Sequence, residues 1–131
     1  MKKIVFTLLL LISSLFAEIK NEYLSQKLLD SKIPIVDIRT TSEWKETGII
    51  KGSIPIMFFN EKGQYNLKAF IDELNKKVDT TKPFALVCRT GSRTKMVSAY
   101  LSQELHYKVT NILGGITYPQ IKKLPFVKYI K

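Results

Sequence analysis

A chain of 131 residues, 45% of them hydrophobic, is long enough to bury the core of one domain, and its single cysteine excludes an intramolecular disulfide framework. The formal net charge of +10 favours anionic ligands, acidic partners and anionic membrane surfaces over cationic ones. The basic residues are scattered and form no stripe interleaved with aromatic residues, which argues against a nucleic acid as partner.

The N-terminal residues have the pattern of a secretory signal peptide. Two lysines follow Met1, an apolar stretch covers residues 4–16, and the small Ala17 ends it. A membrane-spanning helix needs about 20 apolar residues, whereas this stretch is shorter and is interrupted by two serines. We therefore expect residues 1–17 to be a cleaved signal peptide and residues 18–131 to form one domain that is periplasmic or otherwise exported. We expect no stable membrane insertion.

The first elements expected in the exported part are a helix and a buried strand. Asn21 can cap a helix over residues 21–29, in which Leu24 and Leu28 are four residues apart and share one face. Residues 33–38 are rich in β-branched side chains, which is typical of a strand that is buried on both faces of a sheet.

A capping box begins the next element. Thr40 can accept a hydrogen bond from the amide of Glu43, whose carboxylate can reach back, and the helix that starts there is expected to end at Gly48. Residues 54–58 form another short apolar segment, in which Pro55 predicts the edge of a sheet or the end of a strand.

The second half of the chain alternates between strands and helices. Apolar residues recur every three or four positions over residues 67–78 and again over 92–105, which predicts two amphipathic helices. Strands are predicted over residues 84–87 and 109–113. The alternation indicates an α/β fold with a central, mostly parallel sheet and helices on both faces. In such folds ligands bind at the carboxyl ends of the strands.

The only cysteine lies at that edge of the expected sheet. Cys88 follows the strand 84–87 and opens the turn before the helix 92–105. A helix N-terminus presents free backbone N–H groups and a partial positive charge, which favour a thiolate and can hold an anion. In an oxidising compartment this thiol has no partner in its own chain, and a turn rich in Gly, Ser, Thr and Arg favours a reactive thiol over an inert, buried one.

Three patches of sequence, one of which holds this cysteine, occur in a recognisable order. They are Val36-Asp37-Ile38-Arg39 with Glu43 and Trp44, then Gly48 with Gly52, and the turn from Cys88 to Arg93 followed by Gly114 and Gly115. Together they cover nearly all of the exported part, and they resemble the single-domain rhodaneses, a family of sulfurtransferases. The resemblance implies a rhodanese-like fold and the transfer of sulfane sulfur.

The spacing within the cysteine turn separates this resemblance from a related chemistry. Cys88 and Arg93 form a Cys-x4-Arg pattern, whereas tyrosine-type phosphatases use His-Cys-x5-Arg. Val87 stands in place of that histidine, and Thr94 stands where the longer loop needs its arginine. The smaller loop suits a terminal sulfur atom better than a tetrahedral phosphate, so phosphate-ester or arsenate chemistry is the less favoured interpretation.

The resemblance implies catalysis in two steps through a persulfide on Cys88, without a metal or a cofactor. The thiolate takes the outer sulfur of a donor such as thiosulfate or polysulfide and then passes it to a thiol, cyanide or another thiophilic acceptor. The loop that binds the persulfide and the substrate is formed by Arg89, Thr90, Gly91, Ser92 and Arg93. Its backbone amides are expected to cradle the sulfur, and Arg89 is expected to point outward and draw anionic donors. Two roles stay open for Arg93, namely contact with the oxyanion of the donor and a structural pairing that fixes the loop.

Other polar residues near this loop are expected to support it without touching the substrate. Asp37 belongs to this group, and Arg39 and Glu43, four residues apart across a helix start, are expected to form an ion pair. Trp44 is expected to pack in the core. The lone histidine, His106, is expected to cap the C-terminal end of a helix rather than to act as a base.

Two functional hypotheses follow from these residues. The first is an exported sulfurtransferase that uses a small anionic sulfur donor, with a redox or sulfur-relay protein as a candidate partner. The alternative is a sulfur carrier or binding module that serves a membrane-bound partner and has little turnover of its own.

Overall fold

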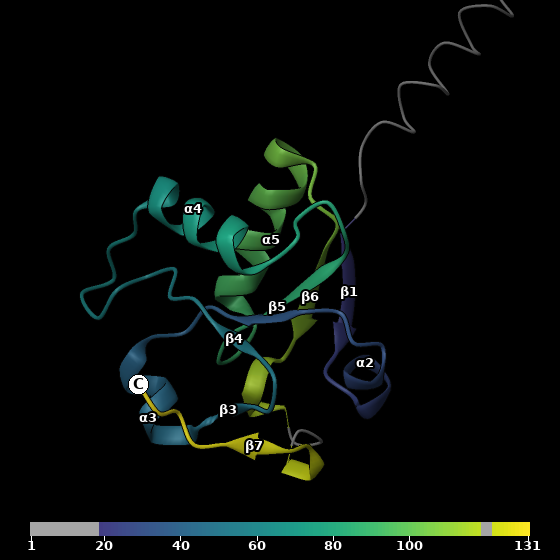
Figure 1. Ribbon diagram of the computed structural model, residues 1–131, viewed down its shortest axis with the longest axis vertical. Helices are drawn as coiled ribbons and strands as arrows, with labels where there is room; N and C mark the ends of the chain where they lie inside the picture. The colour runs from purple at the N-terminus through teal and green to yellow at the C-terminus, as the bar shows by residue number, and fades with distance from the viewer. Residues whose placement is uncertain (1–18, 119–121) are drawn as a thin grey trace, which may run out of the picture.

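The computed structural model describes residues 19–118 and 122–131, and within them five parallel strands form one sheet in the order β1-β6-β5-β2-β4 (Figure 1). These strands are β1 (Lys20–Tyr23), β2 (Ile35–Asp37), β4 (Ile54–Pro55), β5 (Phe84–Val87) and β6 (Val109–Leu113). Two further strands, β3 (Ile49–Ile50) and β7 (Phe126–Val127), form a separate antiparallel pair. The parallel central sheet expected from the sequence is therefore confirmed.

Helices cover both faces of this sheet. On one face lie α4 (Leu67–Lys77) and α5 (Ser92–Leu105), and the side chains buried there include Phe70, Leu74, Val97 and Leu101 from the helices and Val36, Leu86 and Val109 from the sheet. On the other face α2 (Gln26–Asp30) and part of the C-terminal residues pack through Leu28, Leu124 and Phe126 against Ala85, Val87 and Ile112. The arrangement predicted by the alternation of strands and helices is thus observed.

Most of the expected element boundaries are confirmed. The helix α3 (Thr41–Thr47) begins after Thr40, whose hydroxyl accepts a hydrogen bond from the Glu43 amide at 3.4 Å, and it ends at Gly48 with φ of 75°. The strand that contains Pro55 lies at the edge of the sheet. His106 caps the C-terminal end of α5 in the left-handed region, as expected.

The prediction of a helix over residues 21–29 is wrong for the first half of that segment. Lys20–Tyr23 form β1, which pairs in parallel with β6, and the helix α2 begins only after Ser25, whose hydroxyl accepts from the Leu28 amide at 3.1 Å. The Asn21 side chain, expected to cap a helix, instead accepts a hydrogen bond from the Asn111 amide group at 3.0 Å. Backbone pairing with β6 satisfies more groups than one marginal helical turn does, so tertiary contacts override the local signal.

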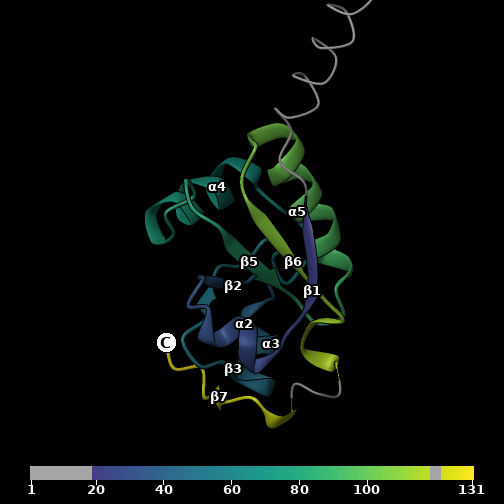
Figure 2. The same ribbon diagram turned by 90° about the vertical axis from the view of Figure 1, so that its right-hand side faces the viewer.

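Residues 122–131, here called the C-terminal strap, run along α3 and β3. In the strap, β7 pairs with β3, the Lys51 amide donates to the Pro125 carbonyl at 2.9 Å, and the Tyr129 ring packs against Trp44 with centroids 5.2 Å apart. Figures 1 and 2 both place β7 beside α3 and β3 at the lower end of the molecule. Trp44 is buried, as expected, and the strap supplies part of its surroundings.

The expected signal peptide, residues 1–17, lies outside the described residues. Across residues 19–118 and 122–131, no helix is both long enough and apolar enough to cross a membrane.

Candidate active site

The cysteine loop, residues 88–93, lies where β5 ends and α5 begins, at the carboxyl edge of the sheet. The neighbouring strand is tied to this edge by a hydrogen bond from the Ile38 amide to the Val87 carbonyl at 3.0 Å. From the other side, the amides of Ile116 and Thr117 donate to the carbonyls of Cys88 and Arg89, both at 3.1 Å. The loop is thus held between two neighbouring segments.

Cys88 is fully buried, with an apolar side and a polar side. Its side chain has 0% exposure and belongs to the apolar cluster beneath α4 and α5. On the polar side, the Gly91 amide donates to Sγ at 3.1 Å, and the thiol donates to the Thr94 hydroxyl at 3.7 Å. That hydroxyl in turn donates to the Gly91 carbonyl at 3.2 Å. The thiol is therefore neither exposed nor surrounded by apolar groups alone.

The first turn of α5 leaves backbone donors next to the thiol. Gly91 occupies the N-cap of α5 with φ of 101°. Because glycine has no side chain, the helix start has no capping hydrogen bond from a side chain. The N–H groups of a first helical turn have no partner within the helix, and they carry the positive end of the helix dipole. The start of α5 can therefore stabilise negative charge on a sulfur attached to Cys88.

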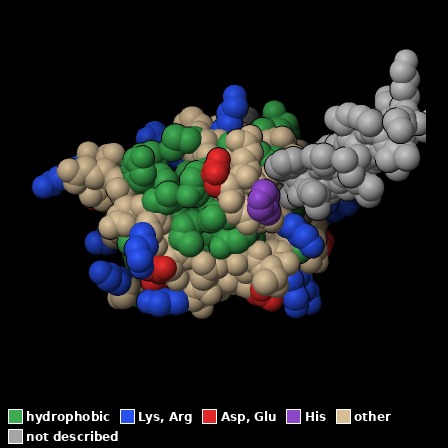
Figure 3. All heavy atoms as spheres, turned by 90° about the horizontal axis from the view of Figure 1, so that it is seen from above, with side chains coloured by type: hydrophobic (Ala, Val, Ile, Leu, Met, Phe, Trp, Pro, Cys, Tyr) green, Lys and Arg blue, Asp and Glu red, His purple; other side chains and the backbone are tan. Residues whose placement is uncertain are grey.

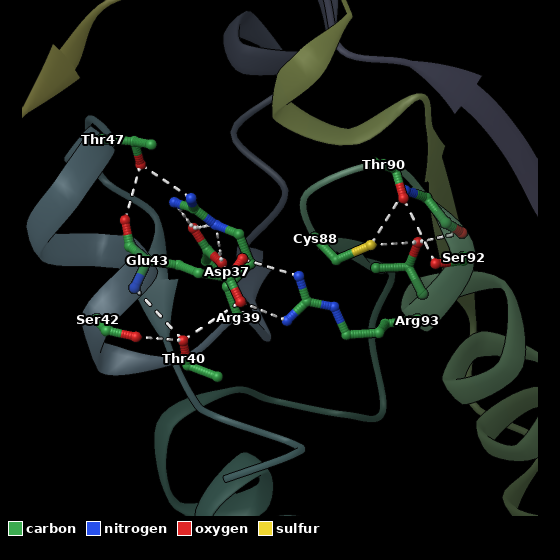
Figure 4. Close-up of polar contacts among 12 residues, drawn as sticks. Asp37, Arg39, Thr40, Ser42, Glu43, Thr47, Cys88, Thr90, Ser92 and Arg93 are labelled. Carbon is green, nitrogen blue, oxygen red and sulfur yellow. Dashed lines mark hydrogen bonds and ion pairs between the residues drawn. The ribbon is translucent and has the colours of Figure 1, made fainter. Parts of the chain in front are cut away.

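Arg93 makes a two-pronged ion pair with Glu43 of α3. Its terminal nitrogens donate to Glu43 Oε1 at 2.9 Å and to Oε2 at 2.8 Å, and both side chains are about four-fifths buried. Figure 4 shows Arg93 extending from α5 toward Glu43 across the space beside Cys88. Of the two roles left open for Arg93, the structural pairing that fixes the loop is the one observed.

Burial raises the pKa of the Glu43 carboxyl, but the hydrogen bonds and charge of Arg93, together with the Thr40 hydroxyl, outweigh it and hold that pKa below its ordinary value. The hydrogen bonds and charge of Glu43 raise the pKa of the Arg93 guanidinium. The pair therefore stays ionised at neutral pH and links α3 to the cysteine loop by charge.

The prediction of an ion pair between Arg39 and Glu43 is wrong. The fully buried Arg39 binds Asp37 instead, with Nε at 3.0 Å from Oδ1 and Nη2 at 2.9 Å from Oδ2. The rest of its guanidinium donates to Thr47 Oγ1 at 2.9 Å and to the Gly48 carbonyl at 3.0 Å. These acceptors occupy the donors of Arg39, which leaves Glu43 to Arg93.

The loop has an exposed rim above the buried thiol. The side chains of Arg89, Thr90 and Ser92 are exposed, and the two hydroxyls lie 3.4 Å apart. A cavity of about 200 Å³ opens beside the loop and is lined by Arg39, Glu43, Glu46, Thr47, Arg89, Ile116 and Thr117. The outward position expected for Arg89 is confirmed, at the edge of this cavity.

Two residues that touch the site were missed as functional candidates. The sequence marks Thr94 only as the residue that stands where a longer loop has its arginine. Its hydroxyl contacts both Cys88 Sγ and the Gly91 carbonyl. Gly115, expected only as part of a glycine pair, has no room for a side chain. A Cβ there would lie 2.5 Å from the Cys88 carbonyl oxygen and closer still to that of Arg89.

Gly115→Ala is expected to destabilise the protein by about 3 kcal/mol, because a methyl group must displace the backbone of the loop and because Gly115 has a positive φ. Gly63→Ala is the matched control, since Gly63 also has a positive φ (74°) but nothing within 4 Å of a Cβ, and it is expected to cost about 1 kcal/mol. Denaturant unfolding of both variants measures the difference. Equal losses would contradict the close packing of Gly115 on the loop.

Replacing Glu43 with glutamine is expected to flatten the pH dependence of stability on the acid side. Because the folded pKa of Glu43 is lowered, its carboxylate contributes stability above the unfolded value of about 4.3, and this contribution is lost as the pH falls through the lowered folded value. The gap in Tm between wild type and Glu43→Gln should therefore be widest at pH 6–7 and shrink below about pH 4. Glu104→Gln, an exposed change on α5, controls for the loss of one carboxylate. A gap that is constant with pH would contradict the ionised pair.

Comparisons with known proteins agree with this fold. The family model of the rhodanese-like domain matches residues 20–118. A protein of Allochromatium vinosum named sulfurtransferase is 34% identical over 100 residues, which are 76% of this chain and 83% of that protein. Among solved structures, the chain resembles Rv0390 of M. tuberculosis (TM-score 0.68, 16% identity, 86% of this chain and 100% of that one). It also resembles a rhodanese-like domain protein of Staphylococcus aureus (TM-score 0.61, 26% identity, 83% and 99%). With a cysteine loop at the carboxyl edge of a parallel sheet, and with a family match that spans most of its length, the chain belongs to the rhodanese family.

Proposed function

We propose that this protein is an exported sulfurtransferase that moves sulfane sulfur from a donor such as thiosulfate or polysulfide to a thiophilic acceptor through a persulfide on Cys88. Family membership and the relative named sulfurtransferase support a sulfurtransferase-type function. The observation that carries the finer proposal is the hydrogen bond from the Gly91 amide to Cys88 Sγ, at a helix start with no side-chain cap. Export rests on the pattern of residues 1–17.

The proposed chemistry needs no external oxidant or reductant. With thiosulfate, the Cys88 thiolate attacks the outer sulfur, a new S–S bond forms, and the bond to the sulfonate sulfur breaks with its electron pair leaving on sulfite. In the second step an acceptor thiolate attacks the same outer sulfur. The bond to Cys88 breaks, and its electron pair returns to Sγ, which regenerates the thiolate.

The residues around Cys88 have separate tasks in this proposal. Backbone donors at the start of α5 hold the negative charge on the outer sulfur, and Gly91 provides the one closest to Sγ. Arg89, exposed at the rim, attracts the anionic donor. Arg93 has both terminal nitrogens on Glu43, so it keeps the loop in shape while the charge on sulfur changes.

A panel of sulfur donors, read by intact mass, tests the proposal. Protein treated with thiosulfate or polysulfide is expected to gain the mass of one sulfur atom on Cys88 and to lose it on addition of cyanide. Protein isolated from the periplasm is expected to have a mass that corresponds to a chain beginning at Glu18. No adduct with any donor would overturn the chemistry, and a full-length chain retained in the cytoplasm would overturn export.

A further inference from the structure

The C-terminal strap carries positive charge that nothing in the described chain neutralises. Its four lysines, Lys122, Lys123, Lys128 and Lys131, are exposed, and the sequence from 122 to 131 contains no acidic residue. Across residues 19–118 and 122–131, exposed lysines form ion pairs on and after α4, with Asp72, Glu73 and Asp79 as partners. None of the four strap lysines has such a partner among the described residues.

This contrast matters because basic residues occur on several faces of the protein. Figure 3 shows the molecule from above, where lysine and arginine side chains lie around a group of hydrophobic side chains. The number of basic residues alone therefore does not identify one surface as a binding site. Other exposed lysines, such as Lys27 and Lys108, also have no ion pair among the described residues. The strap differs in that its four lysines lie within one short segment that contains no acidic residue, which gives it a local positive field.

The strap also lies near the cavity beside the cysteine loop. Thr47 and Arg89 line the same cavity, and Gly48, the next residue after Thr47, packs directly against the strap. A Cβ on Gly48 would lie 2.6 Å from the Val127 carbonyl oxygen and 3.9 Å from the Lys128 amide. In Figures 1 and 2, β7 lies at the same end of the molecule as α3. The strap therefore packs against a residue that adjoins the cavity lining, and a macromolecule bound over the cavity can extend onto it.

The geometry of the site restricts how a sulfur acceptor can approach. Cys88 is fully buried, and the cavity beside its loop has a volume of about 200 Å³, which is too small for a folded partner to enter. Such a partner must present its thiol on a narrow, extended segment and rest the remainder of its surface on the rim. Arg89 adds positive charge to that rim, Glu43 is neutralised by Arg93, and Glu46 is the acidic cavity side chain with no ion pair among the described residues.

We propose that the C-terminal strap is the docking surface for an acidic protein that accepts sulfur from Cys88 through a thiol on an extended segment. The exposed apolar side chains of Val127 and Ile130 lie between the strap lysines and add contact area to the charge attraction. The proposal rests on the proposed function, because the transfer step is the attack of the partner's thiolate on the outer sulfur of the Cys88 persulfide. The S–S bond to Cys88 breaks, the electron pair returns to Sγ, and the sulfur leaves on the partner as its persulfide.

Two model peptides test the docking surface. One contains a single cysteine flanked by glutamate and aspartate residues, and the other carries serine and glutamine at the flanking positions. At low ionic strength, sulfur transfer from persulfide-loaded protein is expected to be about tenfold or more faster to the acidic peptide. The two rates should converge near 1 M salt, where the screening length falls to about 3 Å.

Charge reversal locates the effect. Lys123→Glu/Lys128→Glu is expected to remove the preference for the acidic peptide and to leave the rate with the neutral peptide unchanged. Lys27→Glu/Lys108→Glu changes the net charge equally at a different cavity, which lies beside α2 and the starts of β1 and β6, and it is expected to keep the preference. An equal loss in both double variants would overturn the proposal, because it would reduce the effect to net charge.

Binding is measured separately from chemistry with acidic peptide in which serine replaces the cysteine, by fluorescence anisotropy. If Cys88 takes up no sulfur from any donor, the proposed function fails, whereas the docking surface stands or falls with this binding measurement. Absence of strap-dependent binding would overturn the docking surface. Strap-dependent binding to anionic vesicles without any preference for the acidic peptide would also overturn it and would assign the strap to a membrane.

Discussion

Cys88→Ser is expected to abolish sulfur uptake and turnover while the protein remains folded. The serine hydroxyl can accept the hydrogen bond from the Gly91 amide and is close in size to the thiol, so the loss of stability is expected to be about 1 kcal/mol. A hydroxyl at neutral pH is a far weaker nucleophile than a thiolate, and the described site has no histidine beside it to act as a base. Steady-state rates with thiosulfate and cyanide, together with intact mass after donor treatment, measure both steps.

Cys88→Ala separates the loss of the nucleophile from any effect of the new hydroxyl, and thermal unfolding of both variants verifies the fold. Both are expected to give the rate of the uncatalysed blank. Residual sulfur uptake in either variant would contradict Cys88 as the carrier, since the chain has no other cysteine to take its place.

The elements around the thiol could be predicted because their signals are local. The apolar run of β5 is buried along its whole length, and α5 has the same bounds in the structure as in the sequence prediction. A strand that ends in a cysteine, followed by a helix, fixes where the thiol lies in an α/β fold before any coordinates are known. The placement of Cys88 and the exposed position of Arg89 follow from that local order.

The pairing of side chains could not be predicted in the same way. Spacing along a helix favours partners four residues apart, whereas Glu43 binds Arg93, fifty residues further along the chain. Arg39 does not bind Glu43, because Asp37, Thr47 and Gly48 accept its hydrogen bonds instead. Only the position that the fold gives α3 relative to the start of α5 decides between these arrangements.

The same limitation applies to the two ends of the described chain. β1 forms because the edge of β6 is open to it, and the strap gains its structure from β3 and Trp44 rather than from its own sequence. Such short segments bury too little surface to be stable alone, so their local pattern carries little information. The strap is nevertheless connected to the site through α3, since Tyr129 packs on Trp44 of α3, and α3 holds Arg93 through Glu43.

Asp37→Asn is expected to be among the most destabilising single changes in the protein. It keeps the shape of the side chain but removes the negative charge opposite Arg39, which is 1% exposed and cannot regain its hydration. Leaving one member of a buried ion pair uncompensated costs about 3–5 kcal/mol. For a domain of this size such a loss lowers Tm by roughly 10–20 °C, which calorimetry measures directly.

Asp72→Asn is the matched control, because it removes the same charge from the exposed pair that Asp72 forms with Lys68. Surface pairs contribute little, so its Tm should stay close to that of wild type. The double variant Asp37→Asn/Arg39→Met should lose less stability than the sum of its single changes, because no unpaired charge then remains in the core. Strict additivity, or equal losses from Asp37→Asn and Asp72→Asn, would show that the buried pair of Asp37 and Arg39 does not make this contribution to stability.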